Sequence, residues 1–352
     1  MIDSTRKLTR SITVGNVGIG GEFPISVQSM ATIPTEKLDL LFKEIDSLQD
    51  AGCQIVRITI PNINAARKIP EIKKHAKVPI VADIHFNHKL ALMAMDSGID
   101  KVRINPGNIG SHDNVREVLK KAAKLNIPIR IGINSGSLEK LILKKYGHPT
   151  AEAMVESAES HIRICQDFGF HNLAVSLKSS NTLLMIQANR LFSDKYDYPL
   201  HLGVTEAGPV RQGTIKSSVG IGTLLSEGIG DTIRVSLTGS PVEEIKVANS
   251  ILKSLHLIEK GVTIVSCPTC GRTSVNIERI ATKIEKLTEN INKKATIAVM
   301  GCVVNGPGEA RESDIGVACS DKQGVIFRNG KIIDKIPENK IIDRLLSELE
   351  KL

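Results

Sequence analysis

Two short stretches decide the fold, Lys101-Val-Arg-Ile-Asn105 and Ile129-Arg-Ile-Gly-Ile-Asn134. Apolar and polar side chains alternate in both of them. Because successive side chains of a β-strand point to opposite faces, each stretch predicts a strand with one apolar and one polar face. A Val/Ile-Arg-Ile/Val tripeptide recurs at residues 56–58 and 233–235, which is a weak sign of internal repetition.

Runs of this kind alternate with longer helical stretches up to about residue 255. This alternation is typical of parallel strands joined by helical crossovers. Eight such units in about 250 residues is the usual size of a TIM barrel. We therefore predict a (β/α)8 TIM barrel of the α/β class, with a doubly wound sheet as the competing arrangement. The expected strands are Ile25–Met30, Gln54–Ile60, Pro79–Phe86, Lys101–Asn105, Ile129–Asn134, Leu173–Lys178, Leu200–Thr205 and Thr232–Leu237.

The polar faces of these strands carry more positive than negative charge. Polar side chains can point into a TIM barrel near the C-terminal mouth, where active sites of this fold lie. Unpaired buried charge is costly, so an excess of three positive charges predicts an anionic ligand. Arg forks match phosphate oxygens in pairs, although any single Arg could instead pair with an acid from a loop. The cations are Arg57, Arg103, Arg130, Lys178 and Arg234, and the carboxylates are Asp83 and Glu206.

The pattern changes after Lys253, and we expect a separate small α/β domain there. The predicted domains are residues 1–258 for the barrel and 259–352 for the second domain. Strands are expected at Thr263–Ser266, Thr296–Met300, Ile315–Ala318 and Val325–Phe327, and helices at Ser274–Asn292 and Glu338–Leu352.

Three cysteines of this second domain form the strongest chemical pattern, Cys267-Pro-Thr-Cys270 and Cys302. Three thiolates suit an iron–sulfur cluster with one iron left for another ligand. Structural zinc would need a fourth Cys or His, which is missing nearby. The turn-forming segment Asn305-Gly-Pro-Gly308 could bring Glu309 back toward Cys302. A redox dithiol at 267 and 270 with a buried Cys302 is the alternative.

Composition narrows the function classes. The 46 Lys and Arg against 38 Asp and Glu give a net charge of +8, which suits an anionic ligand, an acidic partner or nucleic acid. Aromatic residues are only 3% of the chain, which argues against a base-stacking platform for nucleic acid. No apolar window is long enough for a membrane span, no signal core is apparent, and the cysteines fit a reducing compartment. We therefore expect a cytoplasmic protein that binds neither membrane nor nucleic acid.

Several longer motifs resemble the 4-hydroxy-3-methylbut-2-enyl diphosphate synthase family of the non-mevalonate isoprenoid pathway. The resemblance runs from about Thr13 to past Gly316, in the bacterial two-domain form. It rests on Val27-Gln-Ser-Met30, Ala82-Asp-Ile-His-Phe86, Val102-Arg-Ile-Asn-Pro-Gly-Asn-Ile-Gly110, Ile129-Arg-Ile-Gly-Ile-Asn-Ser-Gly-Ser-Leu138, His201-Leu-Gly-Val-Thr-Glu-Ala-Gly208, Leu225-Ser-Glu-Gly-Ile-Gly-Asp231 and Gly301-Cys-Val-Val-Asn-Gly-Pro-Gly-Glu309, together with the Cys267 motif.

The resemblance implies a reaction and a set of residue roles. It implies a [4Fe-4S] cluster on Cys267, Cys270, Cys302 and Glu309. The implied substrate is 2-C-methyl-D-erythritol 2,4-cyclodiphosphate, whose ring is opened with two electrons from flavodoxin or ferredoxin and loss of water. The residues matching diphosphate contacts are Arg57, Arg103, Arg130, Asn134, Lys178 and Ser236, and those matching polar positions near the reacting carbons are Asp83, His85 and Glu206.

Barrel geometry also predicts a homodimer. The helix after the last strand would return the chain to the end of the barrel opposite the mouth, so either a long connection folds back or a neighbouring subunit supplies the cluster domain to each mouth. The few residues between the last helix and the strand before Cys267 favour the second option. Two other classes remain open at this stage. One is a phosphate-binding TIM-barrel protein with a purely structural metal site, and the other is a basic RNA-binding protein with a zinc-ribbon-like tail.

Overall fold

The computed structural model describes residues 6–105, 109–273, 275–289, 291–302, 308, 312–320 and 323–352. Its contacts divide the chain into two compact units, residues 1–255 and 256–352. Each unit has its own sheet and hydrophobic core. The two are therefore described separately.

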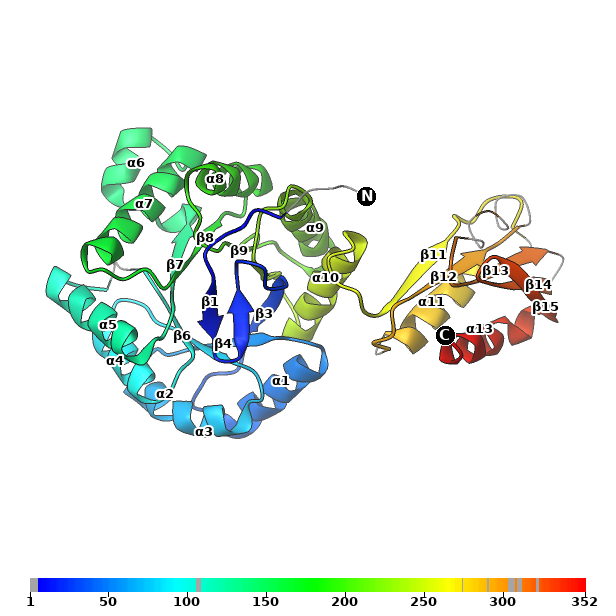
Figure 1. The fold of residues 1–352 in the computed structure, drawn as a ribbon, viewed down its shortest axis with the longest axis horizontal. Coiled ribbons are helices and arrows are strands. Elements are labelled where there is room, and N and C mark those ends of the chain that lie inside the picture. Colours follow the sequence, from blue (N-terminus) through cyan, green and yellow to red (C-terminus); the bar gives the residue numbers. More distant parts are fainter. Residues whose placement is uncertain are drawn as a thin grey trace. The chain divides into compact units, whose positions relative to one another are not determined.

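The first unit is a parallel barrel of eight strands (Figure 1). Neighbouring strands pair in parallel in the order β8-β7-β6-β5-β4-β3-β10-β9. A bridge between Val175 and Leu200 joins the two ends of this series, so the wall is nearly closed. The predicted barrel is confirmed and the doubly wound alternative is wrong. The strands are β3 (Ser26–Met30), β4 (Ile55–Thr59), β5 (Ile80–Asp83), β6 (Lys101–Ile104), β7 (Ile129–Asn134), β8 (Leu173–Lys178), β9 (His201–Leu202) and β10 (Thr232–Ile233).

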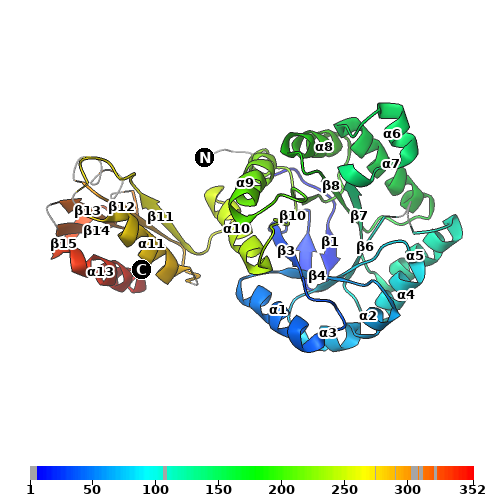
Figure 2. The ribbon, with the colours of Figure 1, turned by 180° about the vertical axis from the view of Figure 1, so that it is seen from behind.

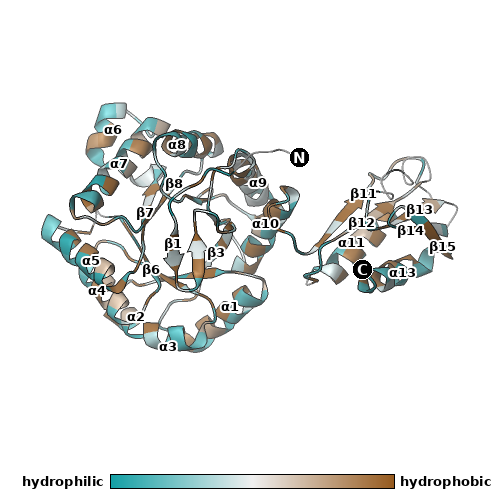
Figure 3. Ribbon diagram, viewed as in Figure 1, coloured by the Kyte–Doolittle hydropathy of each residue, from teal (hydrophilic) through white to brown (hydrophobic). Residues whose placement is uncertain are grey.

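A ring of helices surrounds the barrel, with apolar faces inward and polar faces outward (Figure 3). Short polar side chains cap several helix starts, as the first turn requires. Ser111, Thr150 and Asn181 each accept a hydrogen bond from a backbone N–H three residues later. The helices are α1 (Leu38–Asp50), α2 (Ile63–Arg67), α3 (Ile69–His75), α4 (His88–Asp96), α5 (His112–Leu125), α6 (Lys140–Tyr146), α7 (Ala151–Asp167), α8 (Thr182–Lys195), α9 (Val210–Ser226) and α10 (Pro241–Ser254).

An N-terminal hairpin that the sequence did not predict closes one end of the barrel. Strands β1 (Ile12–Val14) and β2 (Val17–Ile19) pair antiparallel around a two-residue turn. Gly15 opens this turn with φ 57°, a conformation that favours glycine. The hairpin buries Ile12, Val14 and Ile19 against Ile55, Val81 and Ala174 of the wall, at the end where the strands begin. In Figure 1 the hairpin lies over the centre of the ring of helices.

The second unit is a five-stranded mixed sheet with helices packed on one face (Figure 2). The first three strands pair in parallel and the last two antiparallel. The edge strand β15 was not predicted, because its mostly exposed sequence of Ile and Lys lacks a clear buried face. The elements are β11 (Val262–Ser266), α11 (Ile277–Thr288), β12 (Ala295–Met300), β13 (Ile315–Ser320), β14 (Gln323–Arg328), β15 (Lys331–Pro337) and α13 (Ile341–Glu350).

One further difference concerns element lengths. Strands β9 and β10 are two residues long, whereas runs of six had been expected, because their mouth ends leave the sheet as polar loops. None of the helices within the described ranges is long and apolar enough to cross a membrane.

The hairpin predicts a stability effect. Replacing the fully buried Ile19 by Ala should lower the free energy of unfolding of the barrel by roughly 2–5 kcal/mol, because it opens a cavity in the closed end. Leu8, which is 69% exposed in the same segment, is the matched control and should change stability little when replaced by Ala. Urea unfolding followed by circular dichroism measures both variants. Equal effects would show that the hairpin does not close the barrel.

Candidate active site

The inner face of the barrel is rich in cations, where most TIM barrels place branched apolar side chains. The strand pairings put Arg57, Arg103, Arg130 and Lys178 on this face, and each is at most 9% exposed. Burial is the largest factor that lowers the pKa of Arg57, to about 10, and neighbouring cations add to it. The same causes lower the pKa of Lys178 well below its usual value. The interior therefore lacks enough negative charge of its own.

Asp83, at the end of β5, is the carboxylate that faces these cations. Its oxygens lie 3.8 Å from Arg57 Nε and 3.4 Å from Arg103 Nη1. Burial alone would raise the pKa of Asp83, but Arg57, the nearby His85, Arg103 and Arg130 together lower it far below its usual range. Asp83 is therefore ionised at physiological pH and acts as an anchor for the arginines, not as a proton donor.

His85 lies beside this group on the loop after β5. Arg103 Nη1 donates to His85 Nε2 at 2.9 Å, and this nitrogen is 3.6 Å from Asp83 Oδ1. The His85 side chain is 54% exposed, so one side of the ring is open to the mouth. The structure thus brings three of the predicted residues into direct contact: Asp83, His85 and Arg103.

Several arginine donors remain without strong acceptors. Arg57 donates from Nε and Nη2 to the thioether of Met30, which is a weak acceptor. Arg130 Nη1 donates to Ser176 Oγ at 2.6 Å, but its buried Nε and Nη2 have no hydrogen-bond partner. Buried donors without partners are costly. A ligand with several anionic oxygens would satisfy them.

A second carboxylate reaches the interior from outside the barrel. Glu244 on α10 is 5% exposed and lies 3.4 Å from Arg234 Nη2. Its other oxygen accepts a hydrogen bond from Ser29 Oγ at 2.8 Å. Counting Lys101, this cluster holds six basic side chains and two carboxylates, so basic groups outnumber acidic ones by 6 − 2 = 4. The cluster has the charge expected of a site for a polyanion.

Two glycines make room for the cationic side chains. A Cβ on Gly132 would lie 2.7 Å from Arg103 Nε, and one on Gly203 would lie 2.7 Å from Lys178 Nζ. Such contacts are too short for real Cβ atoms. Arg103 and Lys178 therefore occupy space that only a glycine on the neighbouring strand leaves open.

The mouth loops carry the remaining predicted residues. Asn134 ends β7 with a half-buried side chain, and Ser236 is half-buried after β10. Glu206 lies on the loop after β9 with its side chain exposed and with φ 51°. Phe86, next to His85, is 75% exposed and has φ 61°. Left-handed backbone at non-glycine residues is costly and is concentrated at functional sites.

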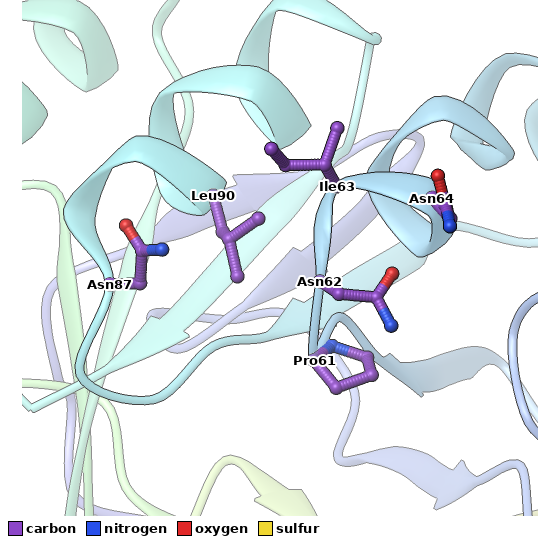
Figure 4. A pocket seen from close by; sticks show the side chains of 6 residues that line it. All are labelled: Pro61, Asn62, Ile63, Asn64, Asn87 and Leu90. Carbon is purple, nitrogen blue, oxygen red and sulfur yellow. The ribbon is translucent and has the colours of Figure 1, made fainter.

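A cavity of about 350 Å³ lies on the rim beside the His85 loop (Figure 4). Its polar side chains are occupied, since Asn62 caps α2 and Asn87 caps α4. No charged side chain lines it. It is lined by Pro61, Asn62, Ile63, Asn64, Asn87 and Leu90.

Three buried polar residues lie deeper in the barrel, and the sequence pattern did not single out Lys101 or Gln28 among them. Lys101, Gln28 and His201 are each at most 1% exposed, and each has side-chain nitrogen or oxygen atoms without a hydrogen-bond partner. Alternate residues of a strand share one face, so Lys101 lies on the same polar face as Arg103 and Asn105. It had been taken only as the start of the strand. His201 had been considered as an acid–base group, but burial first, and then neighbouring cations, lower its pKa well below 6.5.

Two cysteines of the second unit lie at the ends of two neighbouring parallel strands. Cys267 follows β11 and Cys302 follows β12. The backbone N–H of Gly301 donates to Cys267 Sγ at 3.1 Å. A hydrogen bond from the backbone of Arg272 is the main factor that lowers the pKa of Cys270. By contrast, burial raises the pKa of Cys319, in the sheet, to about 12.

These thiols fit a metal cluster chemically, but the structure does not assemble one. Within the described ranges, no group of three or more His, Cys, Asp or Glu side chains is close enough to hold a metal ion. Glu309, the expected fourth ligand, lies outside the described residues. All six cysteines of the chain are free of disulfides.

Fold and site together define a two-domain TIM-barrel protein with a cation-rich barrel interior and a thiol-rich second domain. Family models support this class: the GcpE TIM-barrel domain matches residues 9–249 and the GcpE protein C-terminal domain matches residues 263–351. The chain belongs to the GcpE family.

Similar proteins cover almost the whole chain. A protein of Caldanaerobacter subterraneus is 53% identical over 347 residues, which is 99% of this chain and 98% of the relative. A protein of Clostridium acetobutylicum is 54% identical over 344 residues, covering 98% of this chain and 99% of the relative. Both are named 4-hydroxy-3-methylbut-2-en-1-yl diphosphate synthase (flavodoxin).

A solved structure supports the barrel fold alone. The dihydropteroate synthase of Yersinia pestis matches with a TM-score of 0.50 at 14% identity, over 69% of this chain and 98% of its own.

The glycine contacts predict a selective binding defect. Gly132→Ala should push the Arg103 guanidinium away from its position beside His85 and weaken binding of the cyclic diphosphate roughly tenfold or more, as expected for a lost charged hydrogen bond. Gly136→Ala is the matched control, since a Cβ there meets no atom within 4 Å. Calorimetric titration measures the affinity. Unchanged affinity in Gly132→Ala would show that the ligand does not depend on Arg103.

Proposed function

We propose that this chain converts 2-C-methyl-D-erythritol 2,4-cyclodiphosphate to (E)-4-hydroxy-3-methylbut-2-enyl diphosphate in isoprenoid biosynthesis. Two electrons and two protons enter, and one water leaves. The observation that carries the proposal is the buried excess of cations in the barrel, which suits a compact diphosphate. The names of the two relatives include flavodoxin, which favours flavodoxin as the electron donor here, with ferredoxin as the alternative.

The barrel residues bind and orient the diphosphate. Arg57, Arg103 and Arg130 offer paired donors that match phosphate oxygens, and Lys178 adds a point charge. Asn134, at the end of β7, and Ser236, in the loop after β10, donate at the mouth. Because the arginines are fixed by Asp83 before the ligand arrives, little reorganisation is needed when charge shifts during the reaction.

Two mouth residues lie where proton transfer is needed. His85 is half-exposed and contacts both Arg103 and Asp83, beside the proposed diphosphate site. Glu206 is the best candidate for the acid that releases the hydroxyl as water, since its carboxyl is exposed at the mouth on a strained backbone.

The second domain holds a [4Fe-4S] cluster on Cys267, Cys270 and Cys302, with Glu309 as the resting fourth ligand. When bound, the cluster supplies single electrons and an iron that acts as a Lewis acid. A carboxylate is a harder ligand than thiolate, so Glu309 would hold its iron less firmly than the three cysteines would. We propose a cytoplasmic location, which the free thiols support.

Anaerobic assay of the reconstituted protein with reduced flavodoxin, followed by mass spectrometry of the product, tests this function. Cys302→Ser should lose most iron and all turnover but keep its affinity for the cyclic diphosphate, because the barrel is untouched. Cys165→Ala is the matched control, since this thiol is buried in α7, where burial raises its pKa to about 12.

Full iron content and turnover in Cys302→Ser would contradict the assignment. Iron that stays bound and redox-silent in the wild type would favour a structural metal site. Zinc in place of iron together with steeply salt-dependent RNA affinity would favour the RNA-binding alternative.

The proposal includes a homodimer in which each second domain serves the partner's barrel. Helix α10 runs back from the mouth, and only residues 255–261 connect it to β11, a span of roughly 25 Å when fully extended. The mouth end also carries exposed apolar side chains, which suit coverage by another surface. They lie in the first turns of helices or in the loop before α4: Leu40, Ile63, Phe86, Leu141, Leu183 and Val210.

Mixed dimers test this arrangement. Arg130→Ala and Cys302→Ser subunits should each be inactive alone, because one lacks the diphosphate site and the other lacks the cluster. Co-assembled, they should regain about half of the wild-type sites per mixed dimer, since one intact barrel meets one intact cluster domain. Turnover of purified mixed dimers is the measurement. No recovery, or a fully active monomer, would contradict the shared site.

A further inference from the structure

Lys101 is the most deeply buried cation of the barrel. It begins β6 on the same inner face as Arg103, and its side chain is 0% exposed. Its Nζ has no hydrogen-bond partner. None of the functional roles assigned above uses this residue, although an unpaired buried amine is costly to keep.

The groups around Lys101 give it no negative charge. Arg130 from β7 and Arg57 from β4 act on it, and His201 from β9 lies within electrostatic reach. The neighbouring wall position is the apolar Val81, against which the N-terminal hairpin packs. Burial first, and then Arg130 and Arg57, lower the pKa of Lys101 to about 7. The amine of the ligand-free protein is thus divided between its charged and neutral forms near neutral pH.

A bound diphosphate would change this balance. Its negative charges would lie against Arg57, Arg103 and Arg130 and would offset their repulsion of a charge on Lys101. We propose that Lys101 is a positioning residue that takes up a proton when the diphosphate binds, so that its ammonium and the ligand charge stabilise each other across the arginines. This inference rests on the proposed function, because it requires an anion in the barrel.

Thermodynamic linkage between proton binding and ligand binding determines how the affinity for the diphosphate changes with pH. Binding raises the pKa of Lys101, so protonation must strengthen binding by the same factor. The contribution of Lys101 to affinity is complete below its free pKa of about 7 and is lost as pH rises through the higher value of the bound state. Asp83 stays ionised and His201 stays neutral through this range, because their pKa values are lowered far below it.

Calorimetric titration of the holoenzyme with the cyclic diphosphate, at pH 8 and without reductant, counts the protons taken up. Buffers of different ionisation enthalpy separate this proton count from the heat of binding. The ligand itself does not interfere, because each phosphorus of the ring carries only one strongly acidic hydroxyl. We expect more than about half a proton per site in the wild type.

Lys101→Met should lose this uptake, bind roughly tenfold more weakly at pH 7, and show an affinity that no longer falls between pH 7 and 8. Met removes the unpaired amine, so the thermal midpoint at pH 6 should rise. Lys124→Met, at the exposed end of α5, is the matched control and should behave as wild type. Lys101→Gln provides a second uncharged side chain and should also lose the uptake.

The outcomes separate this inference from the proposed function. Failure of the wild type to bind the cyclic diphosphate would overturn both. Tight binding with the same proton uptake in wild type, Lys101→Met and Lys101→Gln would overturn the role of Lys101 and leave the proposed function standing. Loss of proton uptake in Lys101→Met and Lys101→Gln, with uptake retained in Lys124→Met, would establish the role of Lys101.

Discussion

The uncompensated positive charge inside the barrel is the constraint on which the rest of the structure depends. Six cations face two carboxylates in a space that most barrels fill with apolar side chains. Burying this charge lowers the stability of the fold, so the packing of the surrounding wall must offset that cost. The apolar outer face of the strands, the ring of helices and the hairpin under Val81 supply that stability. Asp83 is placed where it orders two arginines without cancelling the whole charge.

Much of this interior was predictable because strand parity is a strong signal. An Arg between two branched apolar residues, as in Ile129-Arg-Ile131, must point away from the helices that cover the apolar face. The same rule should have selected Lys101, but a lysine at the first position of a strand resembles a solvated end. The hairpin was missed because three-residue strands carry too little periodicity to distinguish them from a loop. Distances such as that between Asp83 and Arg103 depend on barrel closure, which no local pattern specifies.

The thiol site illustrates a different limit of sequence reasoning. The spacing of Cys267, Cys270 and Cys302 predicted a cluster, and the sheet does place two of them after adjacent parallel strands. A cluster, however, is itself a covalent part of its site, and the loops around it take their form from the metal. The polypeptide alone shows how the ligands are prepared, through the Gly301 N–H and the lowered pKa of Cys270, but not how they converge.

The N-terminal hairpin closes one end of the barrel, so the interior is reached only through the mouth. With Ile12, Val14 and Ile19 sealing the far end, whatever enters by the mouth must leave by it. Substrate and product of the proposed reaction both carry a diphosphate, so they compete for the same arginines and the same route. Each catalytic cycle is therefore sequential at the entrance: the product departs before the next substrate arrives, and any surface that covers the mouth during the chemistry must withdraw once per turnover.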